Sequence, residues 1–161
     1  AKYAMLRSTV SNSSFKIEQA GSDKNYGFCM QGRGSTLYVC EAAIDALSVA
    51  TLRKLGGRDW RQDNYLALGG VTASAEKLPL ALERMLQSSS FNRIVLSLDN
   101  DEPGQRASRN IFALLRQRYP KIEPKVCVPQ EKDFNDQLRV KLQQNAQPPP
   151  SRGTRELGLA K

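Results

Sequence analysis

The pattern of hydrophobic and polar positions changes near residue 35. From Thr36 onward, short apolar runs alternate with stretches in which apolar residues recur every three or four positions. The short runs predict buried strands, the longer stretches predict amphipathic helices, and their alternation predicts strands that run parallel in one sheet. We therefore expect an α/β fold with a four-stranded, mainly parallel sheet flanked by helices. The strands are expected at residues 37–40, 64–68, 93–98 and 125–128.

A helix is expected after each of these strands. The first should end at the Gly56-Gly57 pair and bury a face that carries Ile44, Leu47 and Leu55. Apolar spacing and the positions of proline and serine predict the others at about 78–88, 104–119 and 135–144.

The two flanks of the chain have a different composition. Residues 1–34 are rich in Ser, Gly, Asn and Lys with short alternating pieces, which predicts a β-rich lead-in. Residues 146–161 contain three consecutive prolines and no apolar period, which predicts a flexible C-terminal tail. The interval 35–145 is then the single α/β domain. Because the chain starts without Met, we expect it to be a domain excised from a longer protein.

Composition restricts the chemistry. The chain has a net charge of +8, three cysteines without CxxC spacing, and no histidine. A basic balance favours a polyanionic partner, and the missing histidine removes the commonest general base and transition-metal ligand. The cysteines are expected to be small core residues. No apolar run approaches the length of a membrane-spanning helix, so we expect a cytoplasmic protein without membrane contact.

Three acidic residues fall at predicted strand ends. Glu41 directly follows the first strand, and Asp99 and Asp101 directly follow the third. Carboxyl ends of parallel strands meet at one edge of a sheet, so these side chains are expected to converge. Converging carboxylates repel one another unless a cation lies between them, and Mg²⁺ prefers such oxygen ligands. The alternative is that each acid merely caps a helix.

Three segments resemble a known family: LYVCEAAIDALSVA, IVLSLDNDEPGQRA and KDFNDQL. Their order and strand context resemble the Toprim family, which includes bacterial primases, topoisomerases, ribosomal-RNA maturases and the overcoming-lysogenisation-defect nucleases. With FKIEQAGSDKNYGF included, the likeness is greatest to Toprim-like domains of plasmid and conjugative-element proteins, related to primase Toprim domains, and covers residues 3–142. Ala42 departs from the family pattern, in which Gly commonly follows the Glu.

This resemblance implies a function. Glu41, Asp99 and Asp101 would be the catalytic residues and the ligands of Mg²⁺, with Mn²⁺ as a substitute. The implied reaction is nucleotidyl or phosphoryl transfer, or phosphodiester cleavage, on DNA or RNA, by a primase-like or nuclease-like domain within a larger replication or mobilisation protein. The alternative is a module that binds nucleic acid without turnover.

Further residues have weaker assignments. Four positions are candidates for a second metal ion or for phosphate binding: Asp45, Lys132, Asp133 and Asp136. Structural alternatives remain open for them, namely a solvated helix residue for Asp45 and an Asp N-cap with a local Lys–Asp pair at the start of the last helix. Lys24 and Arg106 are candidates for nucleic-acid binding, although Lys24 lies in a segment that also fits a plain turn.

Overall fold

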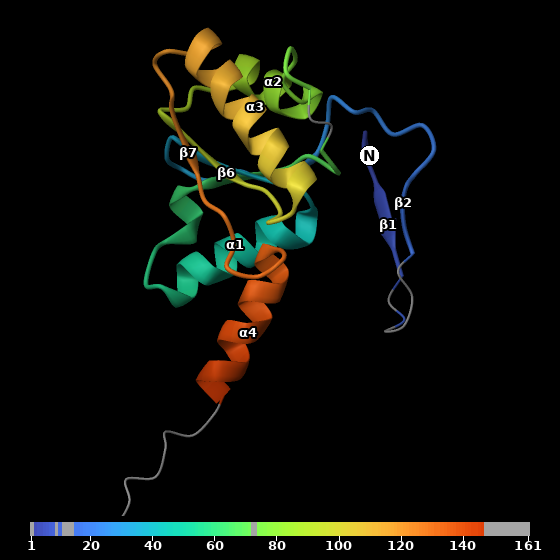
Figure 1. Ribbon diagram of the computed structural model, residues 1–161, viewed down its shortest axis with the longest axis vertical. Coiled ribbons are helices and arrows are strands. Elements are labelled where there is room, and N and C mark those ends of the chain that lie inside the picture. Colours follow the sequence, from blue (N-terminus) through green and yellow to red (C-terminus); the bar gives the residue numbers. More distant parts are fainter. Residues whose placement is uncertain (1, 9, 11–14, 72–73, 147–161) are drawn as a thin grey trace, which may run out of the picture.

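The computed structural model describes residues 2–8, 10, 15–71 and 74–146, in which a central sheet lies between two layers of helices (Figure 1). The sheet has the strand order β3-β5-β4-β6-β7. Its strands are β3 (Phe28–Met30), β4 (Thr36–Cys40), β5 (Asn64–Ala67), β6 (Arg93–Ser97) and β7 (Glu123–Val126). Strands β5, β4, β6 and β7 are parallel, and β3 is antiparallel to β5.

The predicted α/β fold is confirmed, with five strands in the sheet instead of four. The additional strand is β3, which comes from the predicted lead-in and pairs Phe28 with Ala67 along the outer edge of β5. An unpaired edge of β5 would expose a row of backbone hydrogen-bonding groups, and β3 covers it. Three residues are too short a run for the hydrophobic pattern alone to assign them to this sheet.

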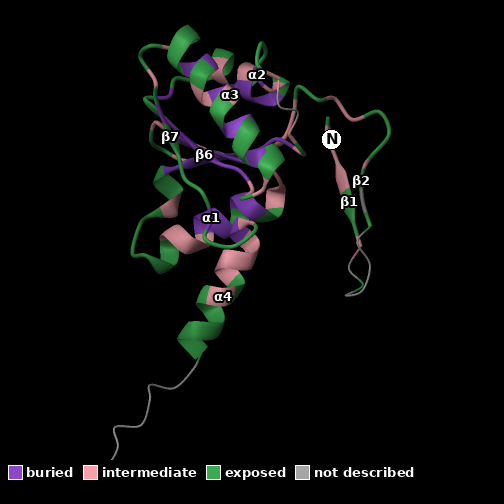
Figure 2. Ribbon diagram, in the orientation of Figure 1, coloured by how far each residue is buried: buried purple, intermediate pink, exposed green. Residues whose placement is uncertain are grey.

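Helices lie on both faces of the sheet, and α4 extends away from the body beyond its first turn (Figures 1 and 2). One face carries α2 (Leu80–Ser88) and α3 (Glu102–Arg118), and the other carries α1 (Ala43–Leu55) and α4 (Phe134–Ala146). The apolar face of α3 is the predicted one, because Ala107, Ile111, Leu114 and Leu115 are all buried. A short 3-10 helix, η1 (Trp60–Gln62), leads into β5.

The predicted inner face of α1 is wrong. Ile44, Leu47 and Leu55 are each more than a third exposed, whereas Ala46 and Val49 are buried. Small residues face the sheet because α1 lies close to it and also packs against the first turn of α4, where Phe134 is buried. A count of large apolar residues could not show which face this close packing selects.

Strand β7 is displaced from the predicted strand at 125–128. It begins at Glu123, pairs Pro124 with Ile94, and ends at Val126. Proline is acceptable there because β7 is an edge strand. The valines that suggested a buried strand, Val126 and Val128, are about half exposed. The expectation that all cysteines are core residues is also wrong, since Cys40 is buried but Cys29 and Cys127 are exposed.

The N-terminal residues form a separate two-stranded sheet. It pairs β1 (Met5–Arg7) with β2 (Lys16–Glu18) antiparallel, and it stands beside the main body in Figure 1. These are two of the alternating pieces in the predicted lead-in. The predicted tail from residue 147 onward lies outside the described residues, and Ala146 is the last residue of α4. Among the described helices, none is both long and apolar enough to cross a membrane.

Candidate active site

The turn after β4 is tied to the turn after β5 at the carboxyl edge of the sheet. Glu41 immediately follows β4, and its carbonyl oxygen accepts hydrogen bonds from Gly69 N at 2.9 Å and from Gly70 N at 3.2 Å. One step earlier, Leu68 N donates to the carbonyl oxygen of Cys40 at 3.0 Å. These bonds extend the parallel pairing beyond the regular strands, so the backbone of Glu41 has a fixed place above the sheet edge.

The turn after β6 leads directly into α3. Asp101 is the N-cap residue of α3, and its Oδ1 accepts a hydrogen bond from Gly104 N at 2.8 Å. A Cβ atom at Gly104 would lie 2.3 Å from the carbonyl oxygen of Asp99 and 3.2 Å from Asp101 Oδ1. The missing side chain at Gly104 therefore lets the first turn of α3 pack against the residues that carry both aspartates.

Asn100, between the two aspartates, joins this turn to the loop before α4. Its backbone N donates to the carbonyl oxygen of Lys132 at 2.8 Å, and its Nδ2 donates to the carbonyl oxygen of Pro129 at 3.2 Å. Its Oδ1 accepts a hydrogen bond from Gln105 Nε2 at 2.9 Å. Neither Asn100 nor Gln105 is among the residues that the sequence predicts for this site. The available signal was an amide side chain, which both donates and accepts, between two acids at a strand end.

Two more carboxylates lie where the start of α4 meets the first turn of α1. Asp133 Oδ1 accepts a hydrogen bond from Asp136 N at 2.7 Å, as in the N-cap alternative considered for this segment. Asp45, in the first turn of α1, is only 3% exposed, and its Oδ1 accepts a hydrogen bond from Asn135 N at 3.3 Å. The alternative of a solvated side chain at Asp45 is therefore wrong, because its carboxylate is buried between α1 and α4.

These carboxylates act together on Asp99. Burial, followed by the charges of Glu41, Asp45, Asp133 and Asp101, raises the pKa of the Asp99 carboxyl to about 7. Asp99 Oδ1 is buried and accepts no hydrogen bond from the described residues. Glu41 and Asp101, which are predicted to converge with Asp99, and also Asp45 and Asp133 thus lie near enough for their charges to act on Asp99. Their mutual repulsion is the main electrostatic feature of this edge.

The donor set fits a hard divalent cation. It consists of oxygen ligands without histidine, and the buried Asp99 Oδ1 lacks the partner that a cation would supply. Within the described part of the chain, no three His, Cys, Asp or Glu side chains are already arranged to hold a metal ion. Mg²⁺ is compatible with this arrangement because it commonly takes one or two carboxylates and completes its shell with water and phosphate oxygens.

The remaining predicted residues have other surroundings. Three of them lie in exposed ion pairs: Asp136 with Arg139, Lys24 with Glu18, and Arg106 with Glu102. The Lys132 side chain is exposed to solvent, while its carbonyl oxygen is the acceptor for Asn100. The backbone of Lys132 is thus fixed at the carboxylate edge.

Comparison with known proteins gives a family match for this chain but no match to a curated protein. A family model described as Toprim-like matches residues 38–138, an interval that contains all five carboxylates. No curated protein matches the chain. Among solved structures, the chain is similar to the primase fragment of the Bacteriophage T7 primase-helicase protein, with 25% identity and a TM-score of 0.46. The match covers 73% of this chain and only 42% of that fragment.

Proposed function

The chain belongs to the Toprim-like family, and from this premise we propose that it performs Mg²⁺-dependent nucleotidyl or phosphoryl transfer, or phosphodiester cleavage, on DNA or RNA. The observation that carries the proposal is the concentration of negative charge around Asp99. A fold keeps such repulsion where a cation relieves it during function, and this cluster lies at the sheet edge where α/β proteins bind ligands.

The acidic residues of this edge would have two roles, namely binding the cation and stabilising the turn around it. Asp99 and Glu41 would hold Mg²⁺ or Mn²⁺, and the bound ion supplies neutralisation of phosphate charge. Asp101 caps α3 with one carboxylate oxygen and has the other for the cation or its water. In a chain without histidine, Glu41 is also the candidate general base. The exposed Lys132 would bind a phosphate of the substrate.

We place this activity in a larger replication or mobilisation protein of a plasmid or conjugative element. The support is the likeness of FKIEQAGSDKNYGF and KDFNDQL to segments of such proteins. The substrate would be presented by other domains of the parent protein, and the reaction would be primase-like or nuclease-like.

A module that binds nucleic acid without turnover is the second candidate. It is favoured by the helix-capping roles of Asp101 and Asp133, which already engage one carboxylate oxygen of each residue. In this case the carboxylates would bind a cation that bridges to phosphate, and no bond would be broken or formed.

Substitution of the carboxylates separates the two candidates. We expect Glu41→Gln and Asp99→Asn to abolish Mg²⁺-dependent cleavage or primer synthesis while nucleic-acid affinity changes by less than about threefold. The matched control is Glu123→Gln, the same chemical change at the opposite edge of the sheet, where Glu123 pairs with Arg93. Absence of metal-dependent turnover by the wild type on single-stranded and double-stranded DNA and RNA would favour the binding module.

A further inference from the structure

A second charged region lies at the opposite edge of the sheet, where the strands begin. It is built from η1 and the segments that flank it, and we call it the Trp60 surface. Its members are one half-buried aromatic residue and four exposed basic residues: Trp60, Arg33, Lys54, Arg58 and Arg61. Strand β4 separates this edge from Glu41 by five residues, or roughly 15 Å along the strand.

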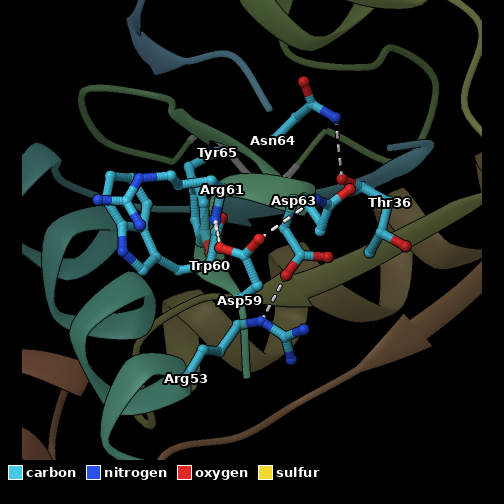
Figure 3. A network of polar contacts seen from close by, with 9 residues as sticks. Thr36, Arg53, Asp59, Trp60, Arg61, Asp63, Asn64 and Tyr65 are labelled. Carbon is cyan, nitrogen blue, oxygen red and sulfur yellow. Dashed lines mark hydrogen bonds and ion pairs between the residues drawn. The ribbon is translucent and has the colours of Figure 1, made fainter. Parts of the chain in front are cut away.

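The basic residues of the Trp60 surface are not neutralised by neighbours. None of the four forms an ion pair within the described residues, and Asp59 is the one acidic residue exposed among them. Asp63 does not offset them, because it is buried and bonded at 2.6 Å to Arg53, a residue outside this set (Figure 3). The surface therefore keeps a net positive charge that solvent or a partner must balance.

The backbone beneath these side chains is fixed. Asp59 Oδ1 accepts a hydrogen bond from Arg61 N at 3.1 Å, and the carbonyl oxygen of Trp60 accepts one from Tyr65 Oη at 3.1 Å. The neighbouring segment is joined to η1 by a bond of 3.0 Å from Arg33 N to the carbonyl oxygen of Arg61. Figure 3 shows Asp59, Trp60, Arg61 and Tyr65 at the start of β5. A fixed backbone lowers the conformational entropy lost when the surface binds a partner.

Trp60 and Arg61 combine an aromatic ring with a positive charge. The Arg61 guanidinium lies over the Trp60 ring, 4.9 Å from its centre. The contact orients a guanidinium that stays exposed, and a guanidinium can donate to phosphate oxygens and stack on a base. Phosphate-binding cations next to an aromatic or guanidinium stacking group are the features with which proteins bind single-stranded nucleic acid.

We infer that the Trp60 surface binds single-stranded nucleic acid as a second contact, separate from the carboxylate edge. The inference goes beyond the proposed function, since it needs neither a metal ion nor turnover. An acidic protein segment would satisfy the charges equally well, but it would make no use of the aromatic and guanidinium pair for stacking. The chemistry thus favours a strand that carries both phosphates and bases.

The chain contains a single tryptophan, so its fluorescence reports on this surface directly. We expect oligo-dT and oligo-U of about 12 nucleotides to quench it, with an affinity that falls about tenfold or more between roughly 50 and 200 mM salt. Quenching by either oligonucleotide supports the inference. The oligonucleotide that binds with the higher affinity shows whether this surface prefers DNA or RNA. Polyglutamate should give no quenching at equal charge concentration. Equal quenching by polyglutamate would overturn the inference in favour of an acidic protein partner.

Variants locate the binding. Arg58→Glu with Arg61→Glu should weaken oligonucleotide binding about tenfold or more, and Trp60→Ala, followed by fluorescence anisotropy, should weaken it about fivefold. The matched control is Arg116→Glu with Lys121→Glu, which changes the charge equally at exposed positions at and beyond the end of α3. If both double variants lost the same affinity for the oligonucleotide, the effect would come from net charge alone, and the inference of a binding site at the Trp60 surface would be refuted.

The test is independent of the proposed function. Glu41→Gln and Asp99→Asn should leave the quenching of Trp60 unchanged, because these residues lie at the other edge of the sheet. A protein without Mg²⁺-dependent turnover that still shows quenching would refute the enzyme proposal and retain this one. Turnover without any quenching would do the reverse.

Discussion

The two edges of the central sheet carry opposite charges in different ways. At the carboxyl edge, the charges of four carboxylates act on Asp99, and one of the four, Asp45, is 3% exposed. At the amino edge, Lys54, Arg58 and Arg61 point into solvent. Exposed charges keep their hydration and hardly affect stability, whereas crowded and buried charges of one sign destabilise the fold until a counter-charge arrives.

This difference in burial and crowding of charge indicates different roles for the two edges. The carboxyl edge is a site in which the protein tolerates local repulsion, which is the expected property of a metal or catalytic centre. The amino edge is a recognition surface without internal conflict. Substitutions at the carboxyl edge should therefore change stability as well as binding, whereas substitutions of the exposed basic residues at the amino edge should change binding alone.

Gly104→Ala should have the largest effect. The new Cβ would lie 2.3 Å from the backbone oxygen of Asp99, and no flexible side chain is available to relieve the clash. We expect a loss of about 3 kcal/mol in the free energy of unfolding and the loss of Mg²⁺ binding, because the turn that carries both aspartates must move. Guanidinium unfolding and calorimetric Mg²⁺ titration measure the two quantities.

Gly56→Ala is the matched control for this substitution. A Cβ atom at Gly56 would lie 3.4 Å from the carbonyl oxygen of Leu52, an ordinary contact distance. Stability within about 0.5 kcal/mol of wild type is expected there. A Gly104→Ala variant that keeps both its stability and its Mg²⁺ affinity would show that the turn after β6 does not need its close packing against α3.

Asp45→Ala should have the second largest effect. It removes the acceptor that Asn135 N finds on α1, and we expect a loss of about 1 to 2 kcal/mol with faster amide exchange at the start of α4. Asp45→Asn retains an acceptor oxygen and removes a charge next to Asp99, so it should restore the stability. A large loss of Mg²⁺ affinity in Asp45→Asn at unchanged stability would instead make Asp45 a metal ligand.

The sequence predicted the carboxyl edge better than it predicted the contacts that support it. The strand ends, and therefore the position of Glu41, Asp99 and Asp101 at one edge of the sheet, follow from hydrophobic runs and from the rule that parallel strands share their carboxyl edge. The burial of Asp45 and the bridging bonds of Asn100 depend on where α4 docks, and α4 has too few apolar residues for the pattern to fix its position. At the amino edge, the fixed backbone of η1 depends in part on contacts between segments far apart in sequence, such as the hydrogen bond from Arg33 N to the carbonyl oxygen of Arg61, which no local pattern contains.

Asp99→Asn should stabilise the metal-free protein at neutral pH. The pKa of Asp99 is raised from its ordinary value near 4 to about 7, so between these values the folded state holds a proton that the unfolded state has lost. Stability therefore falls as the pH rises through this window and is constant above it. We expect the variant to gain about 1 kcal/mol at about pH 8 and almost nothing below about pH 4, the small figure reflecting the partial exposure of the carboxyl.

Unfolding curves recorded in a chelator at several pH values check this sign. Saturating Mg²⁺ should raise the stability of the wild type at about pH 8 and have little effect on the variant, because the cation and the amide remove the same repulsion. A variant that is less stable than the wild type at every pH would mean that the Asp99 carboxylate is favourably solvated, and the contrast between the two edges would lose its electrostatic basis.

Asp136→Asn should have the smallest effect and defines the boundary of the carboxylate edge. Asp136 Oδ1 lies 3.4 Å from Arg139 Nη1 in an exposed i,i+3 pair, an arrangement that contributes little to stability. We expect a change below about 0.5 kcal/mol in the free energy of unfolding and below about twofold in Mg²⁺ affinity. A tenfold loss of affinity would add Asp136 to the residues that hold a cation. In that case the first turn of α4 would reorient on metal binding, because its carboxylate now faces Arg139.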